Sequence, residues 1–203
     1  IATAYLLMAA LIARRRTGEG QLIDTSLWEA TASSAVEGWT QHVLTGSQPD
    51  LCGNRDPLMA PHNLYRCQGE DNWVAISCSS DQEWQAMASL LGINDSRFLA
   101  AASRKEFENQ LDAQIETWTS TRDQWDVTRL LQDVGIPAMP SLDARALEQD
   151  PHLNARGFIE RLNHQEVGAL AHTGVPWLLH DGPNGVRTPA PMLGQHTDEI
   201  LSS

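Results

Sequence analysis

The sequence lacks the features that mark several large classes of protein. It has three cysteines, Cys52, Cys67 and Cys78, without metal-ligand spacing, so we predict neither a disulfide framework nor a zinc site. Basic residues are few, because 14 Lys and Arg stand against 26 Asp and Glu and give a net charge of −12. This charge argues against nucleic acid or an anionic membrane as a partner, since clustered Lys and Arg bind phosphate groups. The cysteine usage indicates a reducing, cytoplasmic location.

Common catalytic motifs are missing as well. Gly18-Glu19-Gly20 has no following glycine, and it comes after a predicted helix, whereas phosphate-binding glycine loops follow a strand. The seven histidines include no pair at i, i+4, and no serine-centred nucleophile elbow occurs. From the residues alone we therefore predict an α/β protein with no metal and no self-evident catalytic centre.

The first 46 residues predict a helix, a turn, a strand and a second helix. Residues 1–13 are almost wholly apolar, which favours a helix buried on every side, and they are too few for a membrane span of about 18 residues. Gly18 and Gly20 permit a reversal into a strand at Leu22-Ile23 that re-enters the core. The next helix begins at a Ser26 cap and stops at Gly46. Because Ile1 is neither Met nor a cap, we expect the chain to start inside an element.

The rest of the chain predicts a small α+β domain followed by an irregular tail. A loop rich in Pro and Gly, 47–61, precedes a hairpin of strands 64–67 and 73–78. Three helices are expected next, from a capping box at Ser80, over 104–118, and from a cap at Thr121 with Gln124 as its box partner. A second hairpin is expected at 158–162 and 168–173, and a short helix at 197–201. We divide the chain into residues 1–50 (helix, turn, strand and helix), 51–60 (linker), 61–150 (small α+β domain) and 151–203 (hairpin, linker and irregular tail).

Six pieces of the chain, in order, resemble one family. The first is Arg14-Arg15-Arg16-Thr17-Gly18-Glu19-Gly20-Gln21 with the helix start Ser26-Leu27-Trp28-Glu29-Ala30. The others are Gly53-Asn54-Arg55, Ala60-Pro61 with Tyr65, Gly135-Ile136-Pro137, Asp150-Pro151-His152-Leu153 with Arg156-Gly157, and Thr188-Pro189-Ala190-Pro191 with Leu193-Gly194 and His196. From Ile1 to about Leu201 the chain is similar to the class III CoA-transferase family, the CaiB/BaiF group.

The resemblance implies the fold and the reaction. The chain is similar to the C-terminal half of the family fold: the end of the large domain, the small α+β domain and the returning tail, normally in an interlocked homodimer. The family transfers CoA between an acyl-CoA and a small carboxylic acid through a covalent aspartyl intermediate, with CoA as substrate and no permanent cofactor. Family spacing puts that aspartate about five residues before Ile1, so the fragment alone is expected to be inactive.

The resemblance also implies substrate-contacting positions. His62 and Asn63 match a place that lines the acyl-CoA pocket in related racemases, although a polar loop before a hairpin is an equal explanation. Gly53-Asn54-Arg55 matches a loop that closes over the thioester, against the alternative of an ordinary linker turn. Leu27 matches a position near the pantetheine arm, and a core leucine at a helix start is the alternative.

Two other functions stay open from the sequence. An acyl-CoA racemase of the same fold uses a glutamate where Ser80 stands, and proton transfer at carbon needs a titratable group, so transferase is favoured. The nearby acids, Asp81 and Glu83, are expected to serve only the helix start. A non-catalytic half that folds with a partner subunit is the second alternative.

Overall fold

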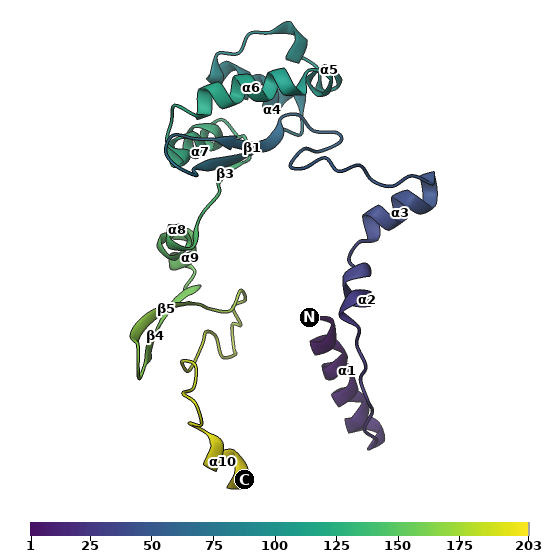
Figure 1. Ribbon diagram of the computed structural model, residues 1–203, viewed down its shortest axis with the longest axis vertical. Coiled ribbons are helices and arrows are strands. Elements are labelled where there is room, and N and C mark those ends of the chain that lie inside the picture. Colours follow the sequence, from purple (N-terminus) through teal and green to yellow (C-terminus); the bar gives the residue numbers. More distant parts are fainter. Residues whose placement is uncertain (203) are drawn as a thin grey trace. The chain divides into compact units, whose positions relative to one another are not determined.

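The structure is a computed structural model that describes residues 1–202, so Ser203 lies outside the described residues. The chain forms two compact units, Ile1–Gly53 and Asn54–Ser203 (Figure 1). We describe each unit by itself, and the finer division into four segments stays a prediction. No helix within residues 1–202 has both the length and the apolar character needed to cross a membrane.

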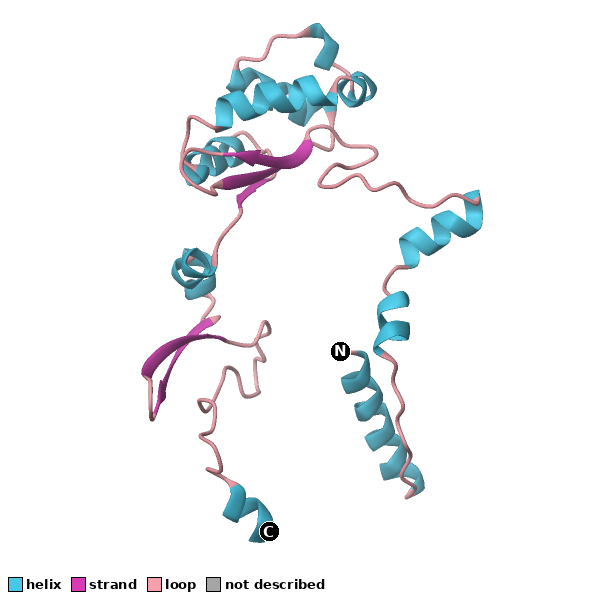
Figure 2. Ribbon diagram, in the orientation of Figure 1, coloured by secondary structure: helices cyan, strands magenta, loops and turns pink. Residues whose placement is uncertain are grey.

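The first unit consists of three helices joined by loops (Figure 2). They are α1 (Ala2–Thr17), α2 (Leu27–Ala32) and α3 (Val36–Thr45). The predicted caps are confirmed: Ser26 Oγ accepts a hydrogen bond from Glu29 N at 3.2 Å, and Gly46 ends α3 in the left-handed conformation. The single helix predicted over 26–46 is wrong, because the chain leaves the helical conformation between Ala32 and Val36.

Two further predictions for this unit are wrong. Residues 18–26 form no strand, and Leu22, expected in the core, is 94% exposed. No residue of α1 is buried in this chain, although its apolar sequence predicted burial. The physical reason is the same for both, since a buried helix or strand needs an opposing apolar layer and this unit contains no sheet that would provide one.

The second unit begins with a three-stranded antiparallel sheet in the order β1-β2-β3. The predicted first hairpin is confirmed as β1 (His62–Arg66) and β2 (Trp73–Ser77), with Tyr65 opposite Val74. The third strand, β3 (Ala138–Pro140), was not predicted, and it pairs with β2 through Ala75 and Met139.

Helices and a hydrophobic core complete this part of the unit. The elements are α4 (Asp81–Leu91), the 3-10 helix η1 (Ser96–Phe98), α5 (Ala101–Glu106), α6 (Glu108–Thr119) and α7 (Gln124–Asp133). Among the described residues, α6 contacts β1, and α7 contacts β2 and β3 (Figure 1). Their apolar faces surround a core that includes Tyr65, Val74, Ile76, Trp84, Met87, Phe98, Leu111, Ile115, Val127, Leu131 and Ile136.

The helix starts and breaks differ in detail from the prediction. Ser80 caps α4 as expected, since its hydroxyl accepts a hydrogen bond from Glu83 N. In return, Glu83 Oε2 accepts from the backbone N–H and the hydroxyl of Ser79, the residue before the cap, and not from the cap residue itself as in a standard capping box. The helix predicted over 104–118 is divided at Phe107 into α5 and α6. The predicted Thr121 cap is wrong, since Asp123 caps α7 through two backbone N–H groups.

The remainder of the second unit contains small elements and long loops. Helices α8 (Ala144–Gln149) and α9 (Pro151–Ala155), which were not predicted, precede the confirmed hairpin of β4 (Ile159–His164) and β5 (Gly168–Thr173). Residues 174–194 have no regular structure, and α10 (Thr197–Ser202) confirms the final helix. Glu160 ties the irregular segment to the hairpin, because both its oxygens accept a hydrogen bond from Val186 N at 3.0 Å.

Candidate functional site

A single carboxylate on α6 collects three side chains from the start of the second unit. Asp112, whose side chain is 15% exposed, accepts hydrogen bonds from Tyr65 Oη at 2.7 Å, Arg55 Nη2 at 2.6 Å and Asn63 Nδ2 at 3.1 Å. Arg55 and Asn63 share Oδ2, and Tyr65 uses Oδ1. Burial raises the pKa of Tyr65, and the charge of Asp112 raises it further, so the phenol stays protonated and acts as a donor.

Arg55 has further partners on the same helix. Its Nη2 donates to Asn109 Oδ1 at 2.8 Å, and its Nε lies 3.7 Å from Glu108 Oε2. Glu108 is buried and also accepts two hydrogen bonds of 2.8 Å from Lys105 Nζ. The two acids lie four residues apart on α6, and the two cations offset the repulsion that such a pair would otherwise suffer.

Four more hydrogen bonds fix residues 54–63, which we call the 54–63 segment. Lys105 Nζ donates to Asp56 O at 2.7 Å, and Arg104 Nε donates to Ala60 O at 2.7 Å. Asp56 Oδ1 accepts from the backbone of Leu58 and Met59, which lowers the pKa of this carboxyl group. The 54–63 segment is thus held to α5 and α6 along its length.

His62 lies within this segment and contacts its beginning. The Nδ1 atom of His62 is 2.7 Å from Asn54 O. Because a carbonyl oxygen can only accept, this contact requires the hydrogen on Nδ1 and leaves Nε2 as the acceptor of the neutral ring. This hydrogen bond joins two residues that lie eight positions apart in sequence.

The structure brings together most of the residues that the resemblance selected. Asn54, Arg55, His62 and Asn63 all lie in the 54–63 segment, and Gly53 directly precedes it with φ 63°. Leu27 lies in the other unit, at the first residue of α2, and is 83% exposed. A direct contact of any of them with a substrate stays a prediction.

Sequence reasoning missed Asp112 and Tyr65 Oη. Asp112 follows the buried Leu111 in a helix with several acids, and its three donors are 57, 49 and 47 residues away along the chain. No local pattern marks such a residue.

Ser80 and the acids beside it have structural partners. The hydroxyl of Ser80 accepts a hydrogen bond from Glu83 N, and Glu83 bonds Ser79. Asp81 Oδ1 accepts from Arg104 Nη2 at 2.8 Å. These three side chains therefore stabilise the start of α4, in agreement with the sequence interpretation.

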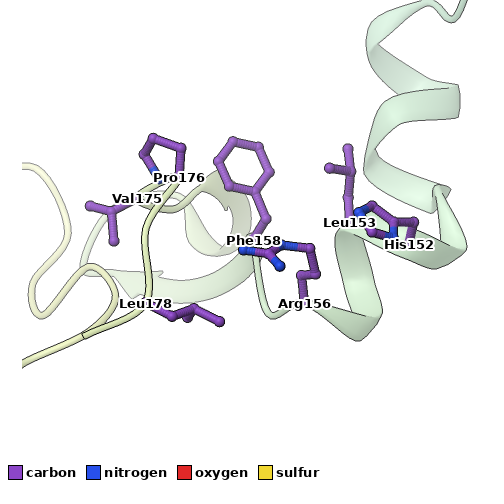
Figure 3. A pocket seen from close by; sticks show the side chains of 7 residues that line it. All are labelled: His152, Leu153, Arg156, Phe158, Val175, Pro176 and Leu178. Carbon is purple, nitrogen blue, oxygen red and sulfur yellow. The ribbon is translucent and has the colours of Figure 1, made fainter. Parts of the chain in front are cut away.

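A separate cavity of about 200 Å³ lies beside α9 (Figure 3). Its side chains come from α9 and the residue after it, from the residue before β4, and from the loop after β5: His152, Leu153, Arg156, Phe158, Val175, Pro176 and Leu178. Arg156 and His152 supply its polar groups, and the other walls are apolar. No member of the predicted site lies in it. Within residues 1–202, no group of three or more His, Cys, Asp or Glu side chains is placed to hold a metal ion.

Comparisons with known proteins agree with the resemblance. The model of CoA-transferase family III matches residues 1–197. The chain is 30% identical to the succinyl-CoA:D-citramalate CoA-transferase of Chloroflexus aurantiacus, covering 100% of this chain and 52% of that protein. It is 27% identical to the succinyl-CoA:mesaconate CoA-transferase of Haloarcula marismortui, covering 99% of this chain and 51% of that protein.

A solved structure shows the same relation at the level of the fold. A CaiB/BaiF family protein from Brucella suis superimposes with a TM-score of 0.86 at 27% identity, covering 98% of this chain and 52% of that one. The expected mixed α/β fold, the C-terminal half of the CaiB/BaiF architecture, is confirmed. The chain spans about half the length of each of these three proteins.

Proposed function

The chain belongs to CoA-transferase family III, and from this premise we propose that the complete protein moves CoA from an acyl-CoA thioester to a free carboxylic acid. The observation that carries the proposal is the match of the family model to residues 1–197. Named CoA-transferases that align with at least 99% of the chain support it. Their names include succinyl-CoA together with D-citramalate or mesaconate, which favours a small carboxylic acid as the acceptor.

The proposed chemistry is covalent catalysis by an aspartate outside residues 1–203, about five residues before Ile1. Its carboxylate attacks the thioester carbonyl and releases CoA as a thiolate, which leaves an acyl-aspartyl anhydride. The thiolate then attacks the aspartyl carbonyl, so that the donor acid leaves and an aspartyl-CoA thioester forms. The acceptor carboxylate attacks the carbonyl of this thioester, which releases the CoA thiolate and forms a second anhydride between the aspartate and the acceptor. The thiolate then attacks the acceptor's carbonyl in this anhydride, so that the new acyl-CoA forms and the aspartate leaves as a free carboxylate.

Residues of this chain would position and cover the acyl group in that scheme. We assign this role to Gly53, Asn54, Arg55, His62 and Asn63. Four of these residues lie in one tethered segment, which supports the assignment. We also propose Leu27 near the pantetheine arm, an interlocked homodimer and a cytoplasmic location. CoA is a substrate here and no resident cofactor is needed.

The test compares the complete protein with residues 1–203 alone. The assay separates the donor and product CoA thioesters by chromatography. We expect transfer of CoA to the carboxylic acid with the complete protein and none with residues 1–203 alone. Replacement of the upstream aspartate by alanine is expected to abolish the transfer. Turnover by residues 1–203 alone would contradict the placement of the nucleophile. Deuterium incorporation at the α-carbon in deuterated water, without transfer, would instead identify a racemase.

A further inference from the structure

We infer that Asp112 is a positioning residue for the CoA transfer. Its carboxylate binds Arg55 and Asn63 and so fixes the 54–63 segment, which carries Asn54 and His62. This inference rests on the proposed function. Asp112 touches no reacting atom in this scheme and acts through Arg55 and Asn63. Sequence reasoning did not select it.

The geometry of the carboxylate supports this role. Asp112 accepts from one donor near each end of the 54–63 segment, Arg55 at 2.6 Å and Asn63 at 3.1 Å, and both use Oδ2. The other oxygen is engaged by Tyr65 Oη, which belongs to the buried edge of β1. Asp112 on α6 thus connects Arg55, at the beginning of the segment, to Asn63 and Tyr65 in β1 through one side chain.

Stability alone does not explain why Arg55 takes part. The hydroxyl of Tyr65 needs an acceptor because the residue is 2% exposed, and Asp112 Oδ1 provides one. The side chain of Arg55, in contrast, is 33% exposed, and its guanidinium could be hydrated equally well in water. The contact with Asp112 therefore fixes the side chain of Arg55 two residues after Gly53, whose positive φ of 63° favours glycine.

His62, the first residue of β1, pairs with Ser77 of β2 and links this strand to the beginning of the segment. Asn54, the neighbour of Arg55, accepts the Nδ1 hydrogen of His62, and Asn63, the neighbour of His62, donates to Asp112. The four residues form a closed ring of contacts through Asp112. Loss of the carboxylate opens this ring at two places. Misplacement of positioning groups by about 1 Å can cost roughly 100-fold in rate.

The experiment uses the Asp112→Asn variant of the complete protein, which keeps the side-chain shape and removes the charge. We expect kcat for CoA transfer to fall by about 10-fold to 100-fold while KM for the acyl-CoA changes less than about threefold. Asp112→Glu restores the carboxylate and should recover part of kcat. The matched control is Asp126→Asn, which removes an acid from an exposed ion pair with Arg129 and should leave kcat unchanged.

A double-mutant cycle separates positioning from a general loss of stability. Arg55→Ala and Asp112→Asn both remove the contact between these two residues, so the double variant should lose less kcat than the product of the two single losses. Amide hydrogen exchange of residues 54–59 should accelerate in both single variants. An inactive wild-type protein would refute the proposed function. An active wild type with equal kcat in Asp112→Asn and Asp126→Asn, or fully additive losses in the cycle, would overturn the role of Asp112.

Discussion

Replacing Arg104 by methionine tests the physical account of how the 54–63 segment joins the core. Arg104 is 1% exposed and donates to three carbonyl oxygens, those of Ala60 at 2.7 Å, Phe98 at 3.1 Å and Leu99 at 3.2 Å. It also donates to Asp81 at 2.8 Å, and its guanidinium lies 5.6 Å from the centre of the Trp84 ring. Methionine keeps much of the volume and removes every donor.

The expected loss is dominated by the orphaned carbonyl groups. Each buried acceptor left without a donor costs about 1–3 kcal/mol. Asp81 contributes little, because its side chain is 52% exposed and water can replace the arginine, as at a surface pair worth about 0–1 kcal/mol. Two of the three carbonyl acceptors, those of Ala60 and Phe98, are buried, so we expect the core around the sheet to lose about 2–6 kcal/mol of stability in Arg104→Met, a large share of a typical domain's total.

Hydrogen exchange of the β2 amides measures this loss without interference from other parts of the chain. Val74 and Ile76 are fully buried in this core, so their amides report its opening free energy. The control is Arg129→Met, which removes an exposed ion pair with Asp126 and should change the stability by less than about 0.5 kcal/mol. A loss below about 1 kcal/mol in Arg104→Met would refute the reasoning, since the three carbonyls would then have found other partners.

Two further predictions concern caps and thiols. Asp123→Ala should destabilise α7 by about 1 kcal/mol in urea unfolding, whereas Thr121→Ala should change it by less than about 0.5 kcal/mol, and equal effects would reject Asp123 as the cap. Burial raises the pKa of Cys67 to about 11 and of Cys78 to about 12, so at pH 8 Cys52 alone should react rapidly with a disulfide reagent. Both pKa values lie above the value of about 8.5 for a thiol in the unfolded chain. The contribution of these thiols to folding stability is therefore complete below about pH 8.5 and is lost as the pH rises towards the folded pKa values, which alkaline unfolding would measure.

Features that depend on neighbouring residues were predictable from the sequence. The hairpin of β1 and β2 follows from alternating apolar residues around a five-residue polar loop, 68–72. The Ser26 and Ser80 caps are three residues from their donors, so a short window contains all the required information. The break at Phe107 was missed because the apolar spacing continues across it.

Features that depend on distant residues were not predictable. The strand β3 has three residues and ends in Pro140, so its existence depends on pairing with β2, more than 60 positions earlier. Asp112 presents the same difficulty, because its role depends on a contact with Arg55, which is 57 residues away in the sequence. Burial of α1 was inferred from its composition. A helix is buried only when a second apolar layer packs against it, and the first unit contains no such layer.

The state of the polar groups in the 54–63 segment indicates what this chain contributes to the proposed reaction. Asp112 accepts three hydrogen bonds and Glu108 accepts two from Lys105, so both carboxylates are engaged by residues of this chain. These contacts fix the geometry of the segment. Placement of reacting groups supplies several kcal/mol of a catalysed reaction's barrier reduction. We therefore expect substitutions in this ring to impair the rate through position, while the covalent chemistry depends on the aspartate proposed outside residues 1–203.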